Sequence, residues 1–188
     1  MNKDKLARIF SEMFNGFATM ILTPVIAITV SPFEIWKKVL YSLIYLFIPL
    51  TTYLILRRLG KVSDYELTKR EERPIYFTIL SLVFGIMYFV LRKYNLEILN
   101  NTSLCIFIVT STITVITFFW KISGHMTYST LLFLTLLYIF NSPWILLLFL
   151  FTPFIAWSRI QLKKHTLAQV IVGTLLVTVI CILIYWVF

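Results

Sequence analysis

Hydrophobic residues along this chain are gathered into long stretches that contain no charged residue. A helix needs about 20 apolar residues to cross the hydrocarbon core of a bilayer, and flanking Trp, Tyr, Lys or Arg can complete a slightly shorter run. The uncharged runs cover residues 13–33, 39–56, 74–91, 98–120, 122–158 and 165–188. The pattern therefore predicts an all-α fold, a polytopic membrane helical bundle of six to seven transmembrane helices.

The run over residues 122–158 is too long for one span and is interrupted at Asn141-Ser142-Pro143. Ser is a good N-cap and Pro fits the first helical position, so one helix should end here and another begin. The first span is interpreted as retained, because no small-residue cleavage site follows it. We expect one integral membrane domain over residues 1–188, with spans at about 14–32, 37–56, 75–92, 100–120, 126–141, 143–157 and 165–187.

Three polar segments, at residues 57–74, 121–125 and 158–165, lie between these spans. Two spans separate each segment from the next, and an even number of crossings returns the chain to the same side. The N-terminus, two spans before the first segment, should share that side. Of the 17 Lys and Arg residues, four lie on the opposite side: Lys37, Lys38, Arg92 and Lys93. The positive-inside rule then predicts that the polar side faces the cytoplasm.

Composition supports lipid as the solvent of this protein. Sixty per cent of the residues are hydrophobic and 13% are charged, which is more apolar surface than a soluble domain can hide. The net charge of +9 fits anionic headgroups and the positive-inside rule better than nucleic acid, since no soluble domain exists to bind it. Cys105 and Cys181 lie far apart within spans, where small buried hydrophobes are expected, and no metal-ligand spacing occurs.

Both histidines of the chain lie in the polar segments. His125 follows Ser123-Gly124 at a predicted helix N-terminus, where free backbone N–H groups and the helix dipole favour an anion. His165 should open the last helix, with Gln169 four residues later on the same face and able to hydrogen-bond the ring.

The same segments supply cations. Arg159 and Arg73 carry planar forks suited to phosphate oxygens, and further positive charge comes from Lys69, Arg70 and Lys121. Two imidazoles with several cations can perform metal-free phosphoryl transfer, one imidazole attacking phosphorus and the other protonating the leaving oxygen. The alternative for each residue alone is a side chain that only extends to the membrane interface.

Lys121 to His125 resembles the Ser-Gly-His motif of the type 2 phosphatidic acid phosphatase superfamily of membrane lipid phosphate phosphatases. Ser158-Arg159, five residues and His165 resemble its third motif, Ser-Arg-x5-His-x3-Asp, and Arg73-Pro74 resembles the end of its first, Lys-x6-Arg-Pro. The resemblance covers residues 57–175, and the phosphatase-like core is expected over about 57–188.

The resemblance implies His165 as the nucleophile that becomes phosphohistidine and His125 as the general acid. It implies phosphoryl binding by Arg73, Arg159, Ser123 and the Gly124 amide, and it implies no metal and no cofactor.

Two positions depart from the family pattern. Glu66 stands where the first motif has Lys, so Lys69 or Arg70 would have to substitute. Gln169 stands where the third motif has Asp, and an amide oxygen can fix the His tautomer without supplying charge. The missing charge could instead come from carboxylates of the long loop, namely Glu71, Glu72 or Asp64.

The expected function is hydrolysis of a polyprenyl phosphate or diphosphate at headgroup depth, with membrane lipids as the surroundings. The open alternatives are a phosphatidate or phosphatidylglycerophosphate phosphatase, a lipid phosphotransferase, and a catalytically weak relative that only binds lipid phosphates. Prenyltransferases and related lipid enzymes need clustered aspartates for magnesium, and this chain has only Asp4 and Asp64.

Overall fold

The computed structural model describes residues 2–187, and these residues form helices and connecting turns without a strand. Six helical segments are long and apolar enough to cross a membrane: Lys3–Val30, Ile35–Arg58, Arg70–Arg92, Glu97–Phe119, Pro143–Gln161 and Leu167–Val187. A shorter apolar helix, Gly124–Phe140, has 17 residues. The predicted all-α membrane bundle of six to seven spans is confirmed, and the chain is an integral membrane protein.

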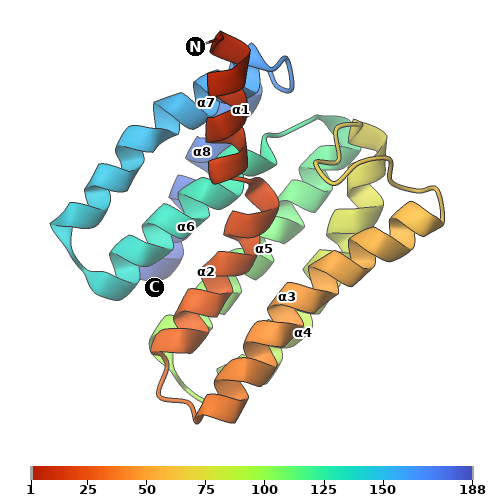
Figure 1. Cartoon of the computed structure of the whole chain (residues 1–188). Helices are drawn as coiled ribbons and strands as arrows, with labels where there is room; N and C mark the ends of the chain where they lie inside the picture. The colour runs from red at the N-terminus through yellow and green to blue at the C-terminus, as the bar shows by residue number, and fades with distance from the viewer. Residues whose placement is uncertain (1, 188) are drawn as a thin grey trace. The chain divides into compact units, whose positions relative to one another are not determined.

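Contacts within the chain divide it into two compact units, which are described separately (Figure 1). Unit 1 comprises Met1–Met20 and Lys121–Phe188. It holds α1 (Lys3–Met13), the start of α2 (Gly16–Val30), α6 (Gly124–Phe140), the 3₁₀ helix η2 (Pro143–Phe151), α7 (Thr152–Gln161), α8 (Leu167–Ile182) and the terminal π-helix η3 (Leu183–Val187).

Unit 2 is Ile21–Trp120. It holds the rest of α2, then α3 (Ile35–Arg58), η1 (Arg70–Glu72), α4 (Arg73–Arg92) and α5 (Glu97–Phe119). The single domain expected over residues 1–188 stays a prediction.

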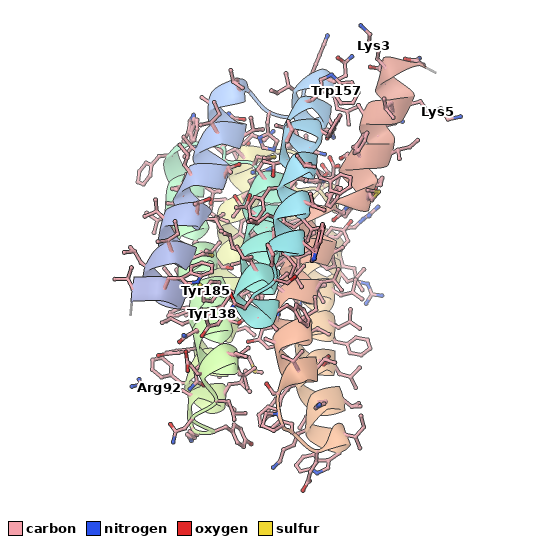
Figure 2. All side chains as sticks on the ribbon, turned by 90° about the vertical axis from the view of Figure 1, so that its left-hand side faces the viewer. Lys3, Lys5, Arg92, Tyr138, Trp157 and Tyr185 are labelled. Carbon is pink, nitrogen blue, oxygen red and sulfur yellow. The ribbon has the colours of Figure 1, made fainter. Side chains whose placement is uncertain are left out.

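In unit 1, α6 and α8 run parallel to each other. At their beginnings, the backbone N–H of Ser123 donates to the Gln169 carbonyl at 3.3 Å. Toward their far ends, the hydroxyls of Thr135 and Tyr185 lie 2.8 Å apart and the rings of Tyr138 and Tyr185 stack at 4.4 Å. Figure 2 shows this tyrosine pair at the end of unit 1 away from Lys3 and Trp157. The N-termini of α6 and α8 therefore share one end of the unit.

Helix α1 packs antiparallel to α7. Phe10 stacks on Phe154 with ring centroids 5.3 Å apart, and Phe14 meets Phe151 at 5.1 Å. Near the start of α1, the Gln161 amide donates to Asp4 at 2.9 Å. The hydrophobic pattern predicted no element for these N-terminal residues. They form a helix that packs at the end of unit 1 where α6 and α8 begin.

The break predicted at Asn141-Ser142-Pro143 is present. Asn141 ends α6 in the left-handed region with φ of 43°, and Pro143 occupies the first turn of the next helix. That helix was expected to be α-helical, but it is a 3₁₀ helix up to Phe151 and becomes α7 only at Thr152. Pro153 occupies the first turn of α7, a position that tolerates proline because its missing N–H would have no partner within the helix.

Unit 2 places the first polar segment at the end of α5. The Arg70 guanidinium donates to the Phe118 carbonyl at 2.6 Å, three residues before Lys121 in the sequence. At the opposite end of the unit, the hydroxyls of Tyr41 and Tyr94 lie 2.8 Å apart. This arrangement agrees with the parity argument, in which the segment at residues 57–74 and the end of α5 lie on the same side of the membrane.

Labelling of single cysteines tests this topology. We expect Lys3→Cys, Tyr65→Cys and Leu162→Cys to react with a membrane-impermeant maleimide from one side of sealed vesicles, and Trp144→Cys from the other. The parent is a suitable background because Cys105 and Cys181 are both buried. Labelling of Tyr65→Cys from the same side as Trp144→Cys would contradict the span parity, and the orientation of the vesicles reports whether the polar side is cytoplasmic.

Candidate active site

Three helix ends come together in unit 1, and each carries one predicted site residue. His125 lies in the first turn of α6, Arg159 in the last turn of α7, and His165 just before α8. Their side chains are buried, with exposed fractions of 6%, 2% and 7%. Helix N-termini favour anions, and a helix C-terminus favours a cation such as Arg159. This end of unit 1 thus gathers imidazoles, a guanidinium and free N–H groups.

His125 and Arg159 contact each other and share a third partner, Ser11 of α1. The Arg159 Nη1 atom lies 3.3 Å from His125 Nε2, and it donates to the Ser11 hydroxyl. Ser11 Oγ is itself 3.5 Å from His125 Nε2. Because a guanidinium can only donate, the nitrogen facing it accepts, and the ring proton of neutral His125 lies on Nδ1. The Arg159 guanidinium, the His125 ring nitrogen and the Ser11 hydroxyl are therefore in mutual contact.

Ser11 is the site residue that the sequence analysis missed. It is 3% exposed and lies four residues after Ala7, which is fully buried, so both occupy the buried face of α1. Asn2 caps this helix by accepting from the Asp4 backbone N–H at 3.0 Å. An N-cap followed by small residues at i and i+4 in a charged segment is the signal that could have identified an amphipathic helix here.

His165 is oriented by Gln169, as predicted. His165 Nδ1 lies 2.9 Å from Gln169 Oε1. The same oxygen accepts from the Thr166 backbone N–H at 3.3 Å, while Thr166 Oγ1 accepts from the Gln169 N–H at 3.4 Å, which forms a capping box. An amide oxygen only accepts, so the ring proton of His165 is on Nδ1 and the lone pair is on Nε2. Gln169 consequently caps the start of α8 and also orients the imidazole of His165.

The turn between α7 and α8 fixes His165 against Arg159. The backbone N–H groups of Lys164 and His165 both donate to the Arg159 carbonyl, at 3.0 and 3.2 Å, and Lys163 has a positive φ of 54°. The Lys121 ammonium donates to the Lys164 carbonyl at 2.9 Å. Lys121, expected to bind phosphate, is thus seen to hold the main chain of this turn.

The Ser123-Gly124-His125 segment is packed tightly against two glycines. A Cβ added at Gly16, the first residue of α2, would lie 2.9 Å from the Gly124 carbonyl carbon, and one at Gly173 would lie 3.2 Å from the Ser123 carbonyl oxygen. In contrast, a Cβ added at Gly124 would meet no atom within 4 Å. Ser123 caps α6 by accepting from the Met126 N–H at 3.5 Å. The segment is therefore packed against Gly16 and Gly173, while the space beside the Cα atom of Gly124 is open.

The remaining predicted phosphate ligands, Arg73, Lys69 and Arg70, belong to unit 2. Arg73 is 5% exposed, and its Nε donates to the Leu67 carbonyl at 2.8 Å. Lys69 pairs with Glu72 at 3.6 Å and its side chain is 66% exposed. Arg70 contacts the Phe118 carbonyl as described above. A shared site of these cations with the two histidines stays a prediction.

The loop carboxylates considered as substitutes for the family Asp make local contacts. Glu72 accepts from the Ser63 N–H at 2.8 Å, and Asp64 accepts from the Thr68 N–H at 3.2 Å. Glu71 lies 3.5 Å from the Arg70 guanidinium. Within residues 2–187, no three His, Cys, Asp or Glu side chains come together as a set of metal ligands.

No protein-family model matches the sequence, and no curated protein or solved structure matches it significantly. The resemblance to lipid phosphate phosphatases consequently stays a prediction from the motifs.

A matched pair of glycine variants tests the packing at the start of α6. We expect Gly16→Ala to destabilise the protein by about 1–3 kcal/mol, because the new methyl group overlaps backbone atoms rather than a flexible side chain. Gly124→Ala should leave stability unchanged or raise it by about 0.5–1 kcal/mol through helix propensity. Thermal unfolding in detergent, followed by tryptophan fluorescence, measures both. Equal melting temperatures for the two variants would contradict this packing.

Proposed function

We propose that this protein is a membrane lipid phosphate phosphatase that hydrolyses a polyprenyl phosphate or diphosphate through a phosphohistidine intermediate. The observation that carries the proposal is the convergence of two buried imidazoles and a buried guanidinium at one end of unit 1. The motifs around His125 and His165 support the same reaction, and they resemble those of the type 2 phosphatidic acid phosphatase superfamily.

In the first step, His165 Nε2 attacks phosphorus. Once Arg159 has turned from His125 Nε2 to a phosphoryl oxygen, His125 can be protonated at Nε2. A P–N bond forms as the P–O bond to the leaving group breaks, and His125 gives this proton to the leaving oxygen. The tautomer assigned to His165 suits this role, because the Nδ1 proton is directed to Gln169 and the lone pair is on Nε2, the attacking nitrogen. The lipid alcohol, or the lipid monophosphate from a diphosphate, departs.

In the second step, water attacks the phosphohistidine. His125 accepts the proton of the water as the new P–O bond forms, and the P–N bond breaks to release inorganic phosphate and restore the His165 lone pair. The hydroxyl group of the water thus ends on phosphorus, and its proton ends on His125, which can protonate the leaving group of the next substrate. If an alcohol of another lipid replaced water, the same steps would make the protein a phosphotransferase.

Cations and N–H groups hold the phosphoryl oxygens during both steps. Arg159 already donates to a neutral oxygen, the Ser11 hydroxyl, next to His125. A phosphoryl oxygen is the stronger acceptor and would take this place. The N–H groups at the start of α6 add to the positive potential there, and the open space at Gly124 permits close approach. In the proposal, Ser123 and Lys121 of unit 1 complete the phosphate environment.

A lipid is the proposed substrate because the histidine cluster is built on the ends of membrane helices. The connections in unit 1 are short, and no soluble domain is present in residues 2–187 to select a sugar or a protein. The N-terminus and the site are proposed to face the cytoplasm, following the Lys and Arg distribution. Phosphatidate and phosphatidylglycerophosphate carry the same headgroup chemistry and are the alternative substrates.

One observation favours a second function, the binding of lipid phosphates without efficient turnover. The partner of His165 is the neutral amide of Gln169, so no negative charge adjoins the imidazole from this side chain when it becomes cationic. Trapping of radiolabelled phosphate on His165 separates the two functions, because a binding protein forms no covalent intermediate.

Substitution of the two histidines tests their roles in purified protein assayed with EDTA present. We expect His165→Ala to abolish phosphate release from every substrate, because it removes the nucleophile. His125→Ala should lower turnover by about 10²–10⁴-fold with a lipid phosphate. It should regain much of that loss with p-nitrophenyl phosphate, whose leaving group needs little protonation. Equal rescue of both variants would show that the roles are misassigned, and activity that requires added magnesium would contradict the metal-free mechanism.

Changing Gln169 tests what the amide contributes. Gln169→Glu keeps the side-chain length that reaches the Thr166 N–H and adds a negative charge beside His165, so we expect turnover to rise by roughly 10- to 100-fold. Gln169→Asp adds the same charge but is one methylene shorter, so it should gain less and lose thermal stability with the capping box. A fall in turnover with Gln169→Glu would instead indicate that another carboxylate already serves His165.

A further inference from the structure

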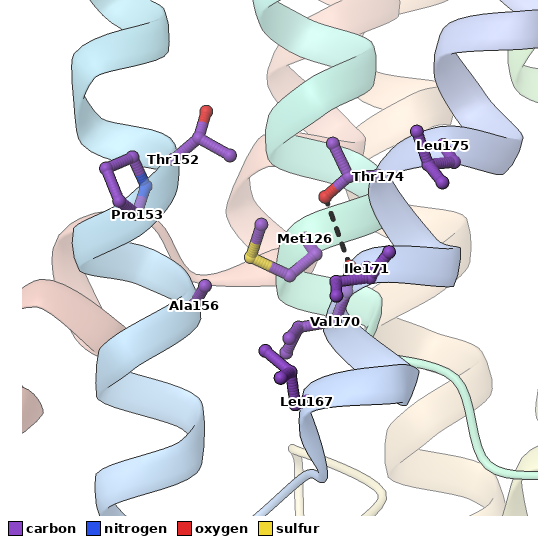
Figure 3. A pocket seen from close by; sticks show the side chains of 9 residues that line it. All are labelled: Met126, Thr152, Pro153, Ala156, Leu167, Val170, Ile171, Thr174 and Leu175. Atoms are coloured by element: carbon purple, nitrogen blue, oxygen red, sulfur yellow. Dashed lines mark hydrogen bonds between the residues drawn. The ribbon is translucent and has the colours of Figure 1, made fainter.

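An apolar groove of about 290 Å³ lies between α7 and α8, with Met126 of α6 behind it (Figure 3). Its volume is near the lower end of small-molecule sites, about 300–1,000 Å³. The lining side chains are Met126, Thr152, Pro153, Ala156, Leu167, Val170, Ile171, Thr174 and Leu175. The wall formed by α7 consists of small residues, and these leave room beside the longer side chains of α8.

The groove offers hydrocarbon contacts to an occupant. Its lining contains no charged residue, and the Thr174 hydroxyl donates to the Val170 carbonyl within α8 at 3.1 Å. Met126 is flexible and polarizable, so it can adapt to irregular apolar chains. From Leu167 to Leu175 the groove follows α8 for roughly 12 Å, at about 1.5 Å per residue. The groove is therefore elongated and apolar, and it lies in a part of the chain that is long and apolar enough to span a membrane.

One end of the groove is lined by residues that lie close in the sequence to the cluster described above. Met126 directly follows His125 in α6, and Leu167 is two residues after His165. Ala156 lies about one turn of α7 before Arg159. At this end of the groove, α6 carries His125, α7 carries Arg159, and His165 lies just before α8. An occupant that matches both features has an anionic head and one apolar chain.

We propose that this groove binds the head-proximal part of the hydrocarbon chain of the lipid whose phosphate the cluster holds. The inference rests on the proposed function and sharpens its substrate class. A groove of about 290 Å³ has room for part of one hydrocarbon chain, so the preferred substrate in this proposal is a single-chain lipid phosphate of the polyprenyl type rather than a two-chain glycerolipid. The chain lies between α7 and α8, with its first units against Leu167 and Met126.

Filling the groove tests the assignment by activity. Ala156→Phe places a ring in the groove, while Val172→Phe adds the same ring at an exposed position of α8 that does not line it. We expect Ala156→Phe to lower the ratio of kcat/KM for farnesyl phosphate to kcat/KM for p-nitrophenyl phosphate by about tenfold or more. Val172→Phe should keep the parent ratio. An unchanged ratio in Ala156→Phe would overturn the groove as the chain site.

Crosslinking separates this inference from the proposed hydrolysis, and it uses the parent protein in case Ala156→Phe does not fold. A farnesyl phosphate analogue with a diazirine in its first isoprene unit should label peptides from residues 152–156 or 167–175. Unlabelled farnesyl phosphate should displace it at much lower concentration than farnesol. Labelling without phosphate release would sustain the groove and refute hydrolysis. Labelling elsewhere, or equal displacement by farnesol, would refute the groove even if phosphate is released.

Discussion

The arrangement at one end of unit 1 depends on the parallel pairing of α6 with α8. Two parallel helices place both N-termini, with their free N–H groups and positive dipole ends, at the same end of the unit. The connecting helix α7 must then end there as well, which brings Arg159 to a helix C-terminus between two N-termini. The close approach is possible because Gly173 presents no side chain to the Ser123 carbonyl. A larger residue at that position would separate the two helices that carry the histidines.

Burial of Arg159 is the energetic cost of this arrangement. A guanidinium that is 2% exposed loses most of its hydration, and removal of its partners would leave an uncompensated charge at a cost of several kcal/mol. Ser11 and His125 supply neutral acceptors, and the C-terminus of α7 supplies partial negative charge. These contacts and the helix terminus offset part of the cost of burying the guanidinium.

Hydrophobic runs and Pro-containing breaks were sufficient to locate the spans, because membrane helices need a fixed length of apolar sequence. The His165–Gln169 contact was predicted as a helical i,i+4 pair, but His165 lies before the N-cap of α8, so the contact instead depends on the capping box that Gln169 forms with Thr166. The contribution of Ser11 was not predictable, because the N-cap and the i,i+4 spacing of Ala7 and Ser11 indicate only a helix, and the contact with Arg159 depends on how α1 packs. Gly16 could not be identified either, since its importance comes from a backbone 108 residues away in the sequence. Long-range contacts between small residues leave little trace in hydrophobic patterning.

Gln169 shows how one residue can be constrained by two requirements at once. Its amide oxygen accepts from the Thr166 N–H and from the His165 ring, so it must reach the N-cap backbone and the imidazole together. The shorter side chain of Asp can serve a neighbouring histidine, but it lacks the length of the Glu or Gln that a capping box uses at this position. At this position the chain thus has a Gln that anchors the start of α8, where the third motif of the lipid phosphate phosphatases has a charged Asp. In the proposed phosphatase mechanism, Gln169 would stabilise the cationic imidazole of the intermediate through its hydrogen bond, without supplying a negative charge of its own.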